Sequence, residues 1–454
     1  MKYQKEKLHL ITGVVLMLFS LLVSCANERK PRRNSTNENK ENTLIEQASN
    51  YSNTPKTNST VTQLNELQGV NVFFENSLSM NGYLGGTSFK TNMFRIDEFA
   101  SVYGEEYHSY FVNTEEHQIT NFWKRIEKKQ IKKGNIYQSN HEFILNNALN
   151  KALNDRLSIV ITDGIYSVSN GDLDIVPLDI ERAFKDVNTN DDIATYVIKL
   201  SSNYNGTYYY ENCEDRKQTK INQERPYYIL LFGKPNHINE FLDAHKKDLV
   251  GIKEFTNFTN RTNYSCDYTV LTKGEEKIGD FESISRSVFP VLNIKDAEKG
   301  TPNRASGKNQ LQFVIAINLN DLSLSQNYLL DNDNYTLNNT KADYSIESIK
   351  AIEKLDKNSK TYHELEKIEE RRNKKYSHII VVNSSAKIYG DINIKLKKQL
   401  PEWIKQTGTN NDCDIVENTS QTIAFDRLIN GISKAYKRTT DKDDYIEFSI
   451  NIKH

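Results

Sequence analysis

Two apolar runs far apart in the chain each end in acidic and hydroxyl side chains. The oxygen-bearing residues are Glu75, Ser77 and Ser79 after residues 70–74, and Thr162 and Asp163 after residues 159–161. In an open α/β sheet, ligands bind at the carboxyl ends of parallel strands. Carboxylate and hydroxyl oxygens suit a hard divalent cation such as Mg²⁺. The sequence therefore predicts a magnesium site where the two runs end.

The elements that must position these side chains alternate between strands and helices. Strand-like runs cover residues 70–74, 107–112, 159–163, 194–200 and 227–232. Apolar residues recur at helical spacing at Leu145, Ala148, Leu149 and Ala152, which predicts a helix over 140–153. Further helices are expected over 92–103, 178–186 and 238–245. This alternation predicts a three-layer α/β fold with a mostly parallel sheet.

Ser139 lies directly ahead of the helix predicted over 140–153, with Glu142 three residues later. This spacing is typical of a capping box, in which the serine hydroxyl accepts a hydrogen bond from a backbone N–H group. The same hydroxyl could instead face the predicted cation. The sequence leaves both roles open.

These residues resemble the metal-ion-dependent adhesion site of the von Willebrand factor A-type domain, and the resemblance spans residues 67–250. The family's Asp-x-Ser-x-Ser motif reads Glu75-Asn76-Ser77-Leu78-Ser79 here, and its Thr-Asp-Gly turn matches Thr162-Asp163-Gly164. Ser139 is the nearest equivalent of a threonine that the family supplies ahead of a helix.

The resemblance implies a Rossmann-like domain that binds Mg²⁺. The ligands that it implies are Glu75, Ser77, Ser79, Ser139 and Asp163. In the family, one coordination position stays open and is filled by an acidic side chain of a protein partner. The resemblance therefore implies a binding module rather than an enzyme.

Glu75 departs from the family, which has aspartate at this position. The extra methylene moves the carboxylate about 1.5 Å further into a site whose metal–oxygen distances tolerate little change. A metal-free scaffold within an envelope assembly therefore stays an alternative. Ser77 and Ser79 could also simply cap the turn that follows them.

Two enzymatic alternatives use the same pocket. Ser77 or Ser79 could act as a nucleophile with His108 or His141 as its base. No Gly-x-Ser-x-Gly elbow surrounds either serine. A metal hydrolase would instead use Glu75 and Asp163, with Asp172 or Asp174, to activate water on the cation.

The amino terminus has the features of a bacterial lipoprotein leader. Three lysines precede an apolar stretch from Leu10 to Leu22, and residues 22–25 resemble a lipobox that ends in Cys25. Residues 1–24 are therefore the predicted signal peptide, and Cys25 the predicted lipidation site. Residues 25–66 are rich in Asn, Ser, Thr and Lys, which predicts a disordered tether. Because no Asp follows Cys25, we expect a lipid anchor in the outer membrane.

Beyond residue 250 the helical periodicity fades. Alternating strands over 312–319, 378–382, 392–396 and 445–452 predict a β-rich, sandwich-like domain over 251–454. The charged stretch near 345–375 predicts an exposed helical insertion. A helical stripe runs from Phe425 to Tyr436, and we expect it to pack on a sheet.

Charge and cysteine content narrow the classes of partner. Removing the three lysines and one glutamate of residues 1–24 leaves 56 basic and 59 acidic side chains. This balance gives no electrostatic reason to expect a nucleic acid partner. Cys213, Cys266 and Cys413 remain after the anchor, and one pair could form a disulfide on an oxidising export route, although the sequence does not choose it.

Overall fold

The computed structural model divides the chain into residues 1–63 and 64–454. It describes residues 66–453 except 168–171, 188–190, 262–263, 265, 285–289, 297–309, 323, 339–343, 385–388 and 441. The predicted leader, the predicted lipidation site Cys25 and, apart from Glu66, the predicted tether lie outside the described residues. No helix within the described part is long and apolar enough to span a membrane.

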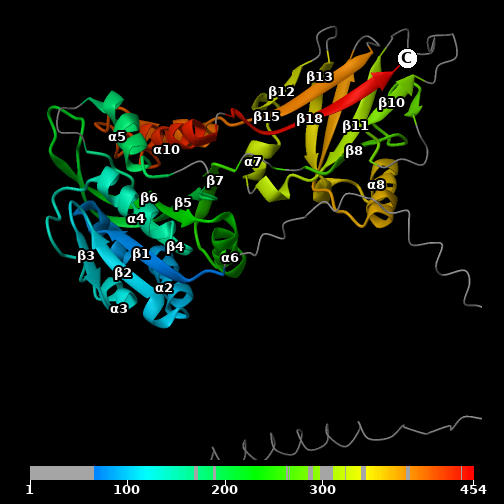
Figure 1. Ribbon diagram of the computed structural model, residues 1–454. Coiled ribbons are helices and arrows are strands. Elements are labelled where there is room, and N and C mark those ends of the chain that lie inside the picture. The colour runs from blue at the N-terminus through cyan, green and yellow to red at the C-terminus, as the bar shows by residue number, and fades with distance from the viewer. Residues whose placement is uncertain are drawn as a thin grey trace, which may run out of the picture. The chain divides into compact units, whose positions relative to one another are not determined.

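The first half of the described chain forms a seven-stranded sheet in the order β3-β2-β1-β4-β6-β5-β7 (Figure 1). Its strands are β1 (Gly69–Glu75), β2 (Tyr107–Val112), β3 (Glu116–Ile119), β4 (Arg156–Thr162), β5 (Ala194–Tyr209), β6 (Gln218–Gly233) and β7 (Ile252–Thr259). Only β1 pairs in parallel, with β2 on one side and β4 on the other. The remaining pairs are antiparallel.

The prediction of a mostly parallel sheet is therefore wrong, because the sheet is mixed and mostly antiparallel. The cause is one long hairpin, in which β5 and β6 are 16 residues each and pair from Ala194↔Gly233 to Tyr209↔Gln218. Antiparallel strands need only a short turn between them, whereas parallel strands need a crossover. No helix is predicted between residues 200 and 227. The absence of a crossover helix between these two strands was the sign of a hairpin in the sequence.

Helices flank both faces of this sheet. They are η1 (Ser79–Gly85), α2 (Thr87–Ser101), η2 (Gly104–Glu106), α3 (Phe122–Glu127), α4 (His141–Ala152), η3 (Leu173–Ile175), α5 (Val176–Ala183) and α6 (Pro235–His245). Successive strand residues point to opposite faces. Phe74 accordingly meets Phe89 of α2, whereas Glu75 meets His141 of α4. Glu75 thus lies between β1 and α4.

The predicted helix over 140–153 is confirmed as α4, but its cap differs from the prediction. The Asn140 side chain accepts the hydrogen bond from the Phe143 backbone N–H at 3.0 Å. Ser139 does not cap the helix, so its hydroxyl is left for another role.

The C-terminal half contains several further β-sheets. The five-stranded sheet has the order β12-β15-β18-β10-β9, the four-stranded sheet β13-β14-β11-β8, and the two-stranded sheet pairs β16 with β17. The strands are β8 (Tyr268–Leu271), β9 (Phe281–Ser283), β10 (Asn293–Asp296), β11 (Leu311–Ile317), β12 (Tyr335–Asn338), β13 (Tyr344–Ala351), β14 (His378–Ser384), β15 (Gly390–Lys397), β16 (Gly408–Thr409), β17 (Thr422–Ile423) and β18 (Asp444–Lys453). One buried apolar cluster contains residues of both larger sheets, such as Phe313 of β11 and Ile394 of β15.

The prediction of an exposed helical insertion near 345–375 needs correction. This stretch begins as strand β13, continues through the short η6 (Ile352–Lys354), and contains one α-helix, α8 (Lys360–Arg372). Leu365 and Ile368 of α8 are buried against the four-stranded sheet, so this helix is not simply exposed. The C-terminal half also contains the short η4 (Asn320–Leu322), α7 (Gln326–Leu329) and η5 (Asn332–Asn334).

The predicted domain boundary after residue 250 falls one strand too early, because β7 pairs with β5 in the first sheet. Late residues also return to that sheet through α9 (Glu402–Thr407) and α10 (Phe425–Thr440). Phe425 stacks on Tyr228 with ring centroids 3.9 Å apart, and Tyr436 shares a 2.9 Å hydrogen bond with Thr195. The predicted helical stripe therefore packs on a sheet, but on the first one.

The hairpin of β5 and β6 passes very close to η1. A Cβ atom on Gly206 would lie 2.6 Å from the Cα atom of Gly82. We expect Gly206→Ala to lower the free energy of unfolding by about 1–3 kcal/mol, because Gly82 is buried and the two backbones cannot separate without losing contacts. Urea denaturation would measure the change. Gly85→Ala is the control, since its Cβ would meet only Lys129 Nζ, at 4.0 Å; equal losses in both variants would contradict the expectation.

His378 predicts a pH dependence of stability. Its Nδ1 lies 2.8 Å from Ser377 Oγ and its Nε2 3.0 Å from Gln326 Oε1, and burial lowers the pKa of His378 from 6.5 to about 4. The unfolded chain therefore binds a proton between pH 6.5 and pH 4 that the folded chain does not, and this contribution to stability is lost as the pH falls.

We expect His378→Gln to reduce the fall in unfolding free energy between pH 6.5 and pH 4 by about 2 kcal/mol. Denaturant titrations across that range would measure it. His363→Gln is the control because His363 is more than half exposed. An unchanged pH slope in His378→Gln would contradict the prediction.

Candidate functional site

Strands β1 and β4 are parallel neighbours that end at the same edge of the sheet, with Phe74 opposite Ile161. Their last residues, Glu75 and Thr162, point to the same face and meet there, where the Thr162 hydroxyl donates a hydrogen bond to Glu75 Oε2. Ser77, Ser79 and Ser139 line a cavity of about 130 Å³ together with Glu75. Asp163 interacts with Glu75 and with the Ser79 hydroxyl. The structure thus brings all five predicted ligands together.

Glu75 is buried, with 1% of its surface exposed. Burial raises the pKa of Glu75, while the hydroxyls of Ser139, Thr162 and Ser77 act in the opposite direction. His141 Nε2 lies 3.7 Å from Glu75 Oε2, but burial lowers the pKa of His141 to about 4. His141 is therefore neutral near pH 7 and does not neutralise the carboxylate.

Asp163 is the second buried carboxylate, also 1% exposed. Its Oδ1 accepts a hydrogen bond from the Ile165 backbone N–H at 3.2 Å, whereas its Oδ2 has no hydrogen-bond partner among the described residues. Burial, and then the negative charge of Glu75, raise the pKa of Asp163 to about 7. Gly164 has a φ of 68°, which lets the chain turn away directly after this carboxylate.

The loop after β1 is held by amide side chains that sequence reasoning did not single out. Asn76 Nδ2 donates to the Ile131 carbonyl at 3.1 Å and to the Lys133 carbonyl at 2.6 Å, and Asn113 Nδ2 donates to Asn76 Oδ1 at 3.2 Å. Within this loop the Ser77 and Ser79 hydroxyls lie 3.1 Å apart. Neither serine caps η1, which has no side-chain cap. The alternative in which these serines are only helix caps is therefore not supported.

Arg225 of β6 is the cationic side chain beside this site. It is almost completely buried, and its guanidinium lies over the rings of Tyr208 at 4.8 Å and Tyr204 at 5.8 Å. Its charge acts on Asp163, but no ion pair between the two is formed within 4 Å. Both buried carboxylates therefore lack a lysine or arginine partner among the described residues.

The donor set fits a hard divalent cation. Burying unpaired carboxylates is costly, and a metal ion is one of the few ways to offset that cost. The described residues contain no group of three or more His, Cys, Asp or Glu side chains placed to hold a metal. A metal here would therefore use Glu75 and Asp163 with the hydroxyls of Ser77, Ser79 and Ser139, which are oxygen donors suited to Mg²⁺.

The further residues that the enzymatic alternatives require do not line this cavity; they are His108 or His141 for the serine nucleophile and Asp172 or Asp174 for the metal hydrolase. His108 lies beside Asn71, near the opposite end of β1 from Glu75. Asp172 accepts a hydrogen bond from the Asp174 backbone, and Asp174 forms an ion pair with Arg427 at 2.5 Å. His141 contacts Glu75 and Thr162 rather than Ser77 or Ser79.

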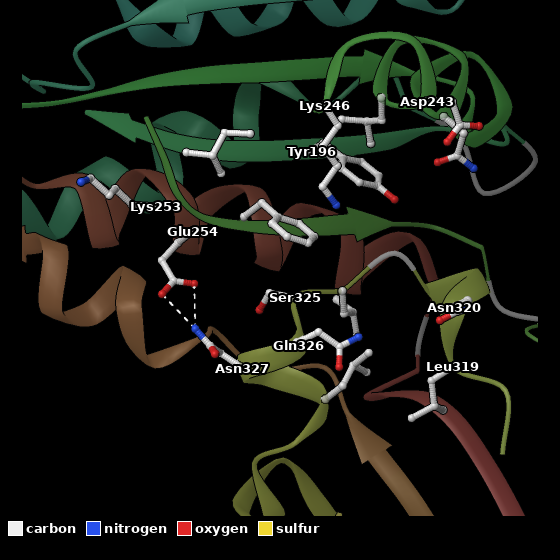
Figure 2. Close-up of a pocket in the computed structure, with 16 residues that line it drawn as sticks. Tyr196, Asp243, Lys246, Lys253, Glu254, Leu319, Asn320, Ser325, Gln326 and Asn327 are labelled. Carbon is white, nitrogen blue, oxygen red and sulfur yellow. Dashed lines mark hydrogen bonds between the residues drawn. The ribbon is translucent and has the colours of Figure 1, made fainter. Parts of the chain in front are cut away.

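A larger hollow of about 510 Å³ lies beside β7, α6 and α7 (Figure 2). Several of its polar groups already have partners: Glu254 accepts from Asn327 at 3.1 Å, and Ser325 accepts from the Tyr328 backbone. Gln326 bonds to His378. This hollow offers volume but no buried, unpaired polar atom comparable to Asp163 Oδ2.

The 130 Å³ cavity also has walls that the sequence did not predict. Tyr209 and Glu211, at the end of β5, line it, as do Tyr137, Gln138 and Ser167. No local pattern marks Glu211, because the long hairpin brings it to the site. The strand predicted over 194–200 in fact continues to Tyr209. A longer predicted strand would have placed Glu211 near the site.

The chain was compared with protein family models, with curated proteins and with solved structures, and none of them matches. The von Willebrand factor A resemblance thus rests on its two short motifs and stays a prediction. The arrangement of Glu75, Asp163 and the surrounding hydroxyls is the observation from which function can be argued.

Proposed function

We propose that the chain is a lipid-anchored binding protein of the cell envelope that holds a divalent cation, Mg²⁺ in the first instance, at Glu75 and Asp163. One observation carries this proposal: Asp163 Oδ2 is buried next to a second buried carboxylate and has no hydrogen-bond partner among the described residues. Two such groups repel each other in a low-dielectric site. A cation between them would remove that repulsion.

The coordination would combine hydroxyls and carboxylates. The Ser77 and Ser79 hydroxyls would bind directly, and Glu75 and Asp163 would bind directly or through water. Ser139 would be a further ligand, since its hydroxyl lies in the cavity beside Glu75 and does not cap α4. Mg²⁺ usually keeps several of its waters, which suits a site with few carboxylates.

A protein partner would then supply an acidic side chain to the remaining coordination position. The rim of the cavity supports a contact surface there, because Tyr137 is 80% exposed beside it. Tyrosine is enriched among the residues that dominate binding energy. On this proposal, residues of the first sheet form a von Willebrand factor A-like domain, and the C-terminal sheets form a sandwich-like domain.

The disulfide between Cys213 and Cys413 supports placement outside the cytoplasm, where disulfides persist. The predicted leader and Cys25 would anchor the chain, in the outer membrane on our proposal. The near balance of basic and acidic side chains argues against a nucleic acid partner. A metal-free scaffold stays the alternative, and it predicts no response to divalent cations.

Metal binding can be tested through its effect on thermal stability. We expect Mg²⁺ to raise the unfolding temperature of the wild-type chain and EDTA to reverse the rise, because a ligand that binds only the folded state stabilises it. Asp163→Asn should abolish this response, and should stabilise the metal-free chain because it removes the repulsion with Glu75. Thermal unfolding with and without Mg²⁺ would measure both effects.

Asp243→Asn is the matched control, because Asp243 is an exposed acidic residue away from the cavity. It should respond to Mg²⁺ as the wild type does. A wild-type chain whose unfolding is indifferent to divalent cations would rule out the proposed site and favour the scaffold alternative.

The length of the side chain at position 75 can be tested through its effect on metal affinity. Glu75→Asp restores the family's residue and withdraws the carboxylate from Thr162, so we expect Mg²⁺ to bind about tenfold more tightly, a gain of about 1.4 kcal/mol. The metal-free chain should lose stability through the lost hydrogen bond. Isothermal titration calorimetry would measure the affinity; weaker binding by Glu75→Asp than by the wild type would show that the longer side chain is the fitted one.

A further inference from the structure

The tip of the β5–β6 hairpin forms one wall of the candidate cation site. Beyond the close approach of Gly206 to Gly82, β5 continues to Tyr209, which lines the cavity with Glu211. Ser77 and Ser139 line the same cavity from the β1 loop and from the residue ahead of Asn140. Glu211 therefore faces the predicted ligands from a segment that carries neither of the two family motifs.

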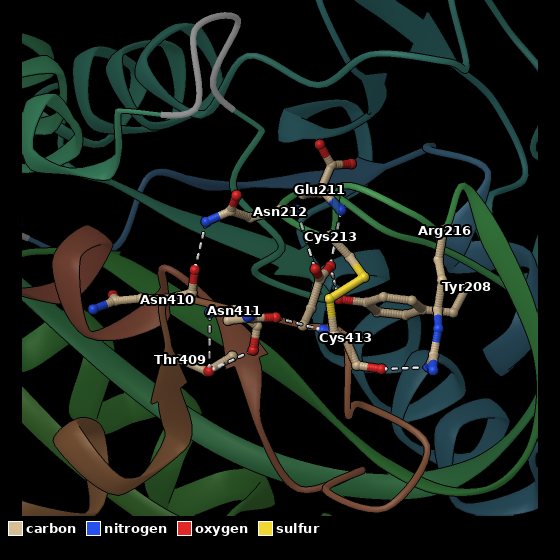
Figure 3. Close-up of a disulfide and its surroundings, with 10 residues drawn as sticks. Tyr208, Glu211, Asn212, Cys213, Arg216, Thr409, Asn410, Asn411 and Cys413 are labelled. Atoms are coloured by element: carbon tan, nitrogen blue, oxygen red, sulfur yellow. Dashed lines mark hydrogen bonds between the residues drawn. A yellow bond between two sulfur atoms is a disulfide. The ribbon is translucent and has the colours of Figure 1, made fainter.

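Asp412 fixes the position of this tip. Its buried carboxylate accepts three hydrogen bonds, from the Tyr208 hydroxyl at 3.0 Å, the Glu211 backbone N–H at 2.8 Å and the Asn212 backbone N–H at 3.1 Å. The next residue, Cys413, forms the disulfide with Cys213 (Figure 3). We call these contacts the tip clasp: Asp412 with its three donors, and the Cys213–Cys413 disulfide.

Outside contacts reinforce the tip clasp. Asn212 Nδ2 donates to the Asn410 carbonyl at 2.6 Å, and Arg216 Nη1 donates to the Cys413 carbonyl at 2.8 Å. The backbone of Glu211 is thus held on both sides. A segment at a hairpin tip is ordinarily among the more mobile parts of a fold, so this density of contacts calls for a reason.

The place of Glu211 offers that reason. Glu211 lines the cavity and is exposed, so its carboxylate lies at the solvent side of the site. Its charge acts on Glu75, and the charge of Asp163 acts on Glu211. The tip clasp thus holds a third, solvent-accessible carboxylate beside two buried ones, where a bound cation would offset the repulsion among them.

We propose that Glu211 is a third acidic group of the cation site, which accepts hydrogen bonds from metal-bound water across the cavity, and that the tip clasp positions it for this role. The inference rests on the proposed function and deepens it. Action through water follows from the absence, in the described residues, of a three-carboxylate group at metal-binding distances. It also suits Mg²⁺, which gives up its waters reluctantly.

The test is cation affinity in the full folded chain. Mn²⁺ can replace Mg²⁺ as a probe, and electron paramagnetic resonance counts free Mn²⁺ directly. We expect Glu211→Gln to weaken Mn²⁺ binding about tenfold, the Coulomb effect of one charge several ångströms from a divalent ion in water. Glu214→Gln is the matched control, because Glu214 is an exposed glutamate on the same tip and does not line the cavity. It should change the affinity less than twofold.

A second variant tests the positioning role. Asp412→Asn keeps the shape of residue 412 but weakens its hold on the tip, so it should also reduce Mn²⁺ affinity. In a Glu211→Gln background the same change should have little further effect, because its influence passes through Glu211. Thermal unfolding in EDTA, compared between variants, separates loss of the site from loss of the fold.

The outcomes are distinct. Equal Mn²⁺ affinities of Glu211→Gln and Glu214→Gln, with the wild type still binding, would overturn the role of Glu211 and leave the proposed function standing. Full additivity of Asp412→Asn and Glu211→Gln would overturn the positioning role of the clasp. A wild-type chain that binds no Mn²⁺ would overturn the proposed function itself.

Discussion

The candidate site depends on the repulsion between two buried carboxylates. Glu75 ends β1, and Asp163 directly follows the end of β4, its parallel neighbour, so the backbone of the sheet holds the two residues close together. The surrounding residues supply hydroxyls and a neutral imidazole rather than an ion-pair partner. Such a pair is unfavourable unless it is protonated, as the raised pKa of Asp163 indicates, or bridged by a cation. The proposed function corresponds to the second state, in which a cation bridges Glu75 and Asp163.

Segments that are distant in the sequence pack around this pair of carboxylates. The β1 loop is tied to residues 131–133 by Asn76, and the hairpin tip is tied to residues 410–413 by Asp412 and a disulfide. Arg225 lies nearby, stacked on tyrosines that also belong to the hairpin. Rigid support of this kind is what a preorganised binding site requires, since ligands must be held in place before the cation arrives.

How far the sequence could predict the fold depends on the range of the interactions involved. The strand ends at Glu75 and Thr162 and the helix at 141–152 follow from local patterns, and they were predicted. The antiparallel half of the sheet was not, because the pairing of β6 with β4 depends on the long hairpin rather than on any local signal. The cap at Asn140 was missed because serine and asparagine are equally good caps. The position of Glu211 and the pairing of Cys213 with Cys413 depend on contacts between residues about two hundred positions apart. The spacing of residues along the sequence does not reveal such contacts.

The return of residues 402–440 to the first sheet has a consequence for the order of synthesis. Phe425 and Tyr436 pack beside Tyr228 and Thr195, and both emerge only after every strand of the two larger C-terminal sheets except β18 has been made. The strands of the first sheet are therefore complete while residues 260–424 are still being added. During that interval the apolar surface that α10 will cover is exposed to solvent, which is the condition under which a nascent chain aggregates or binds a chaperone.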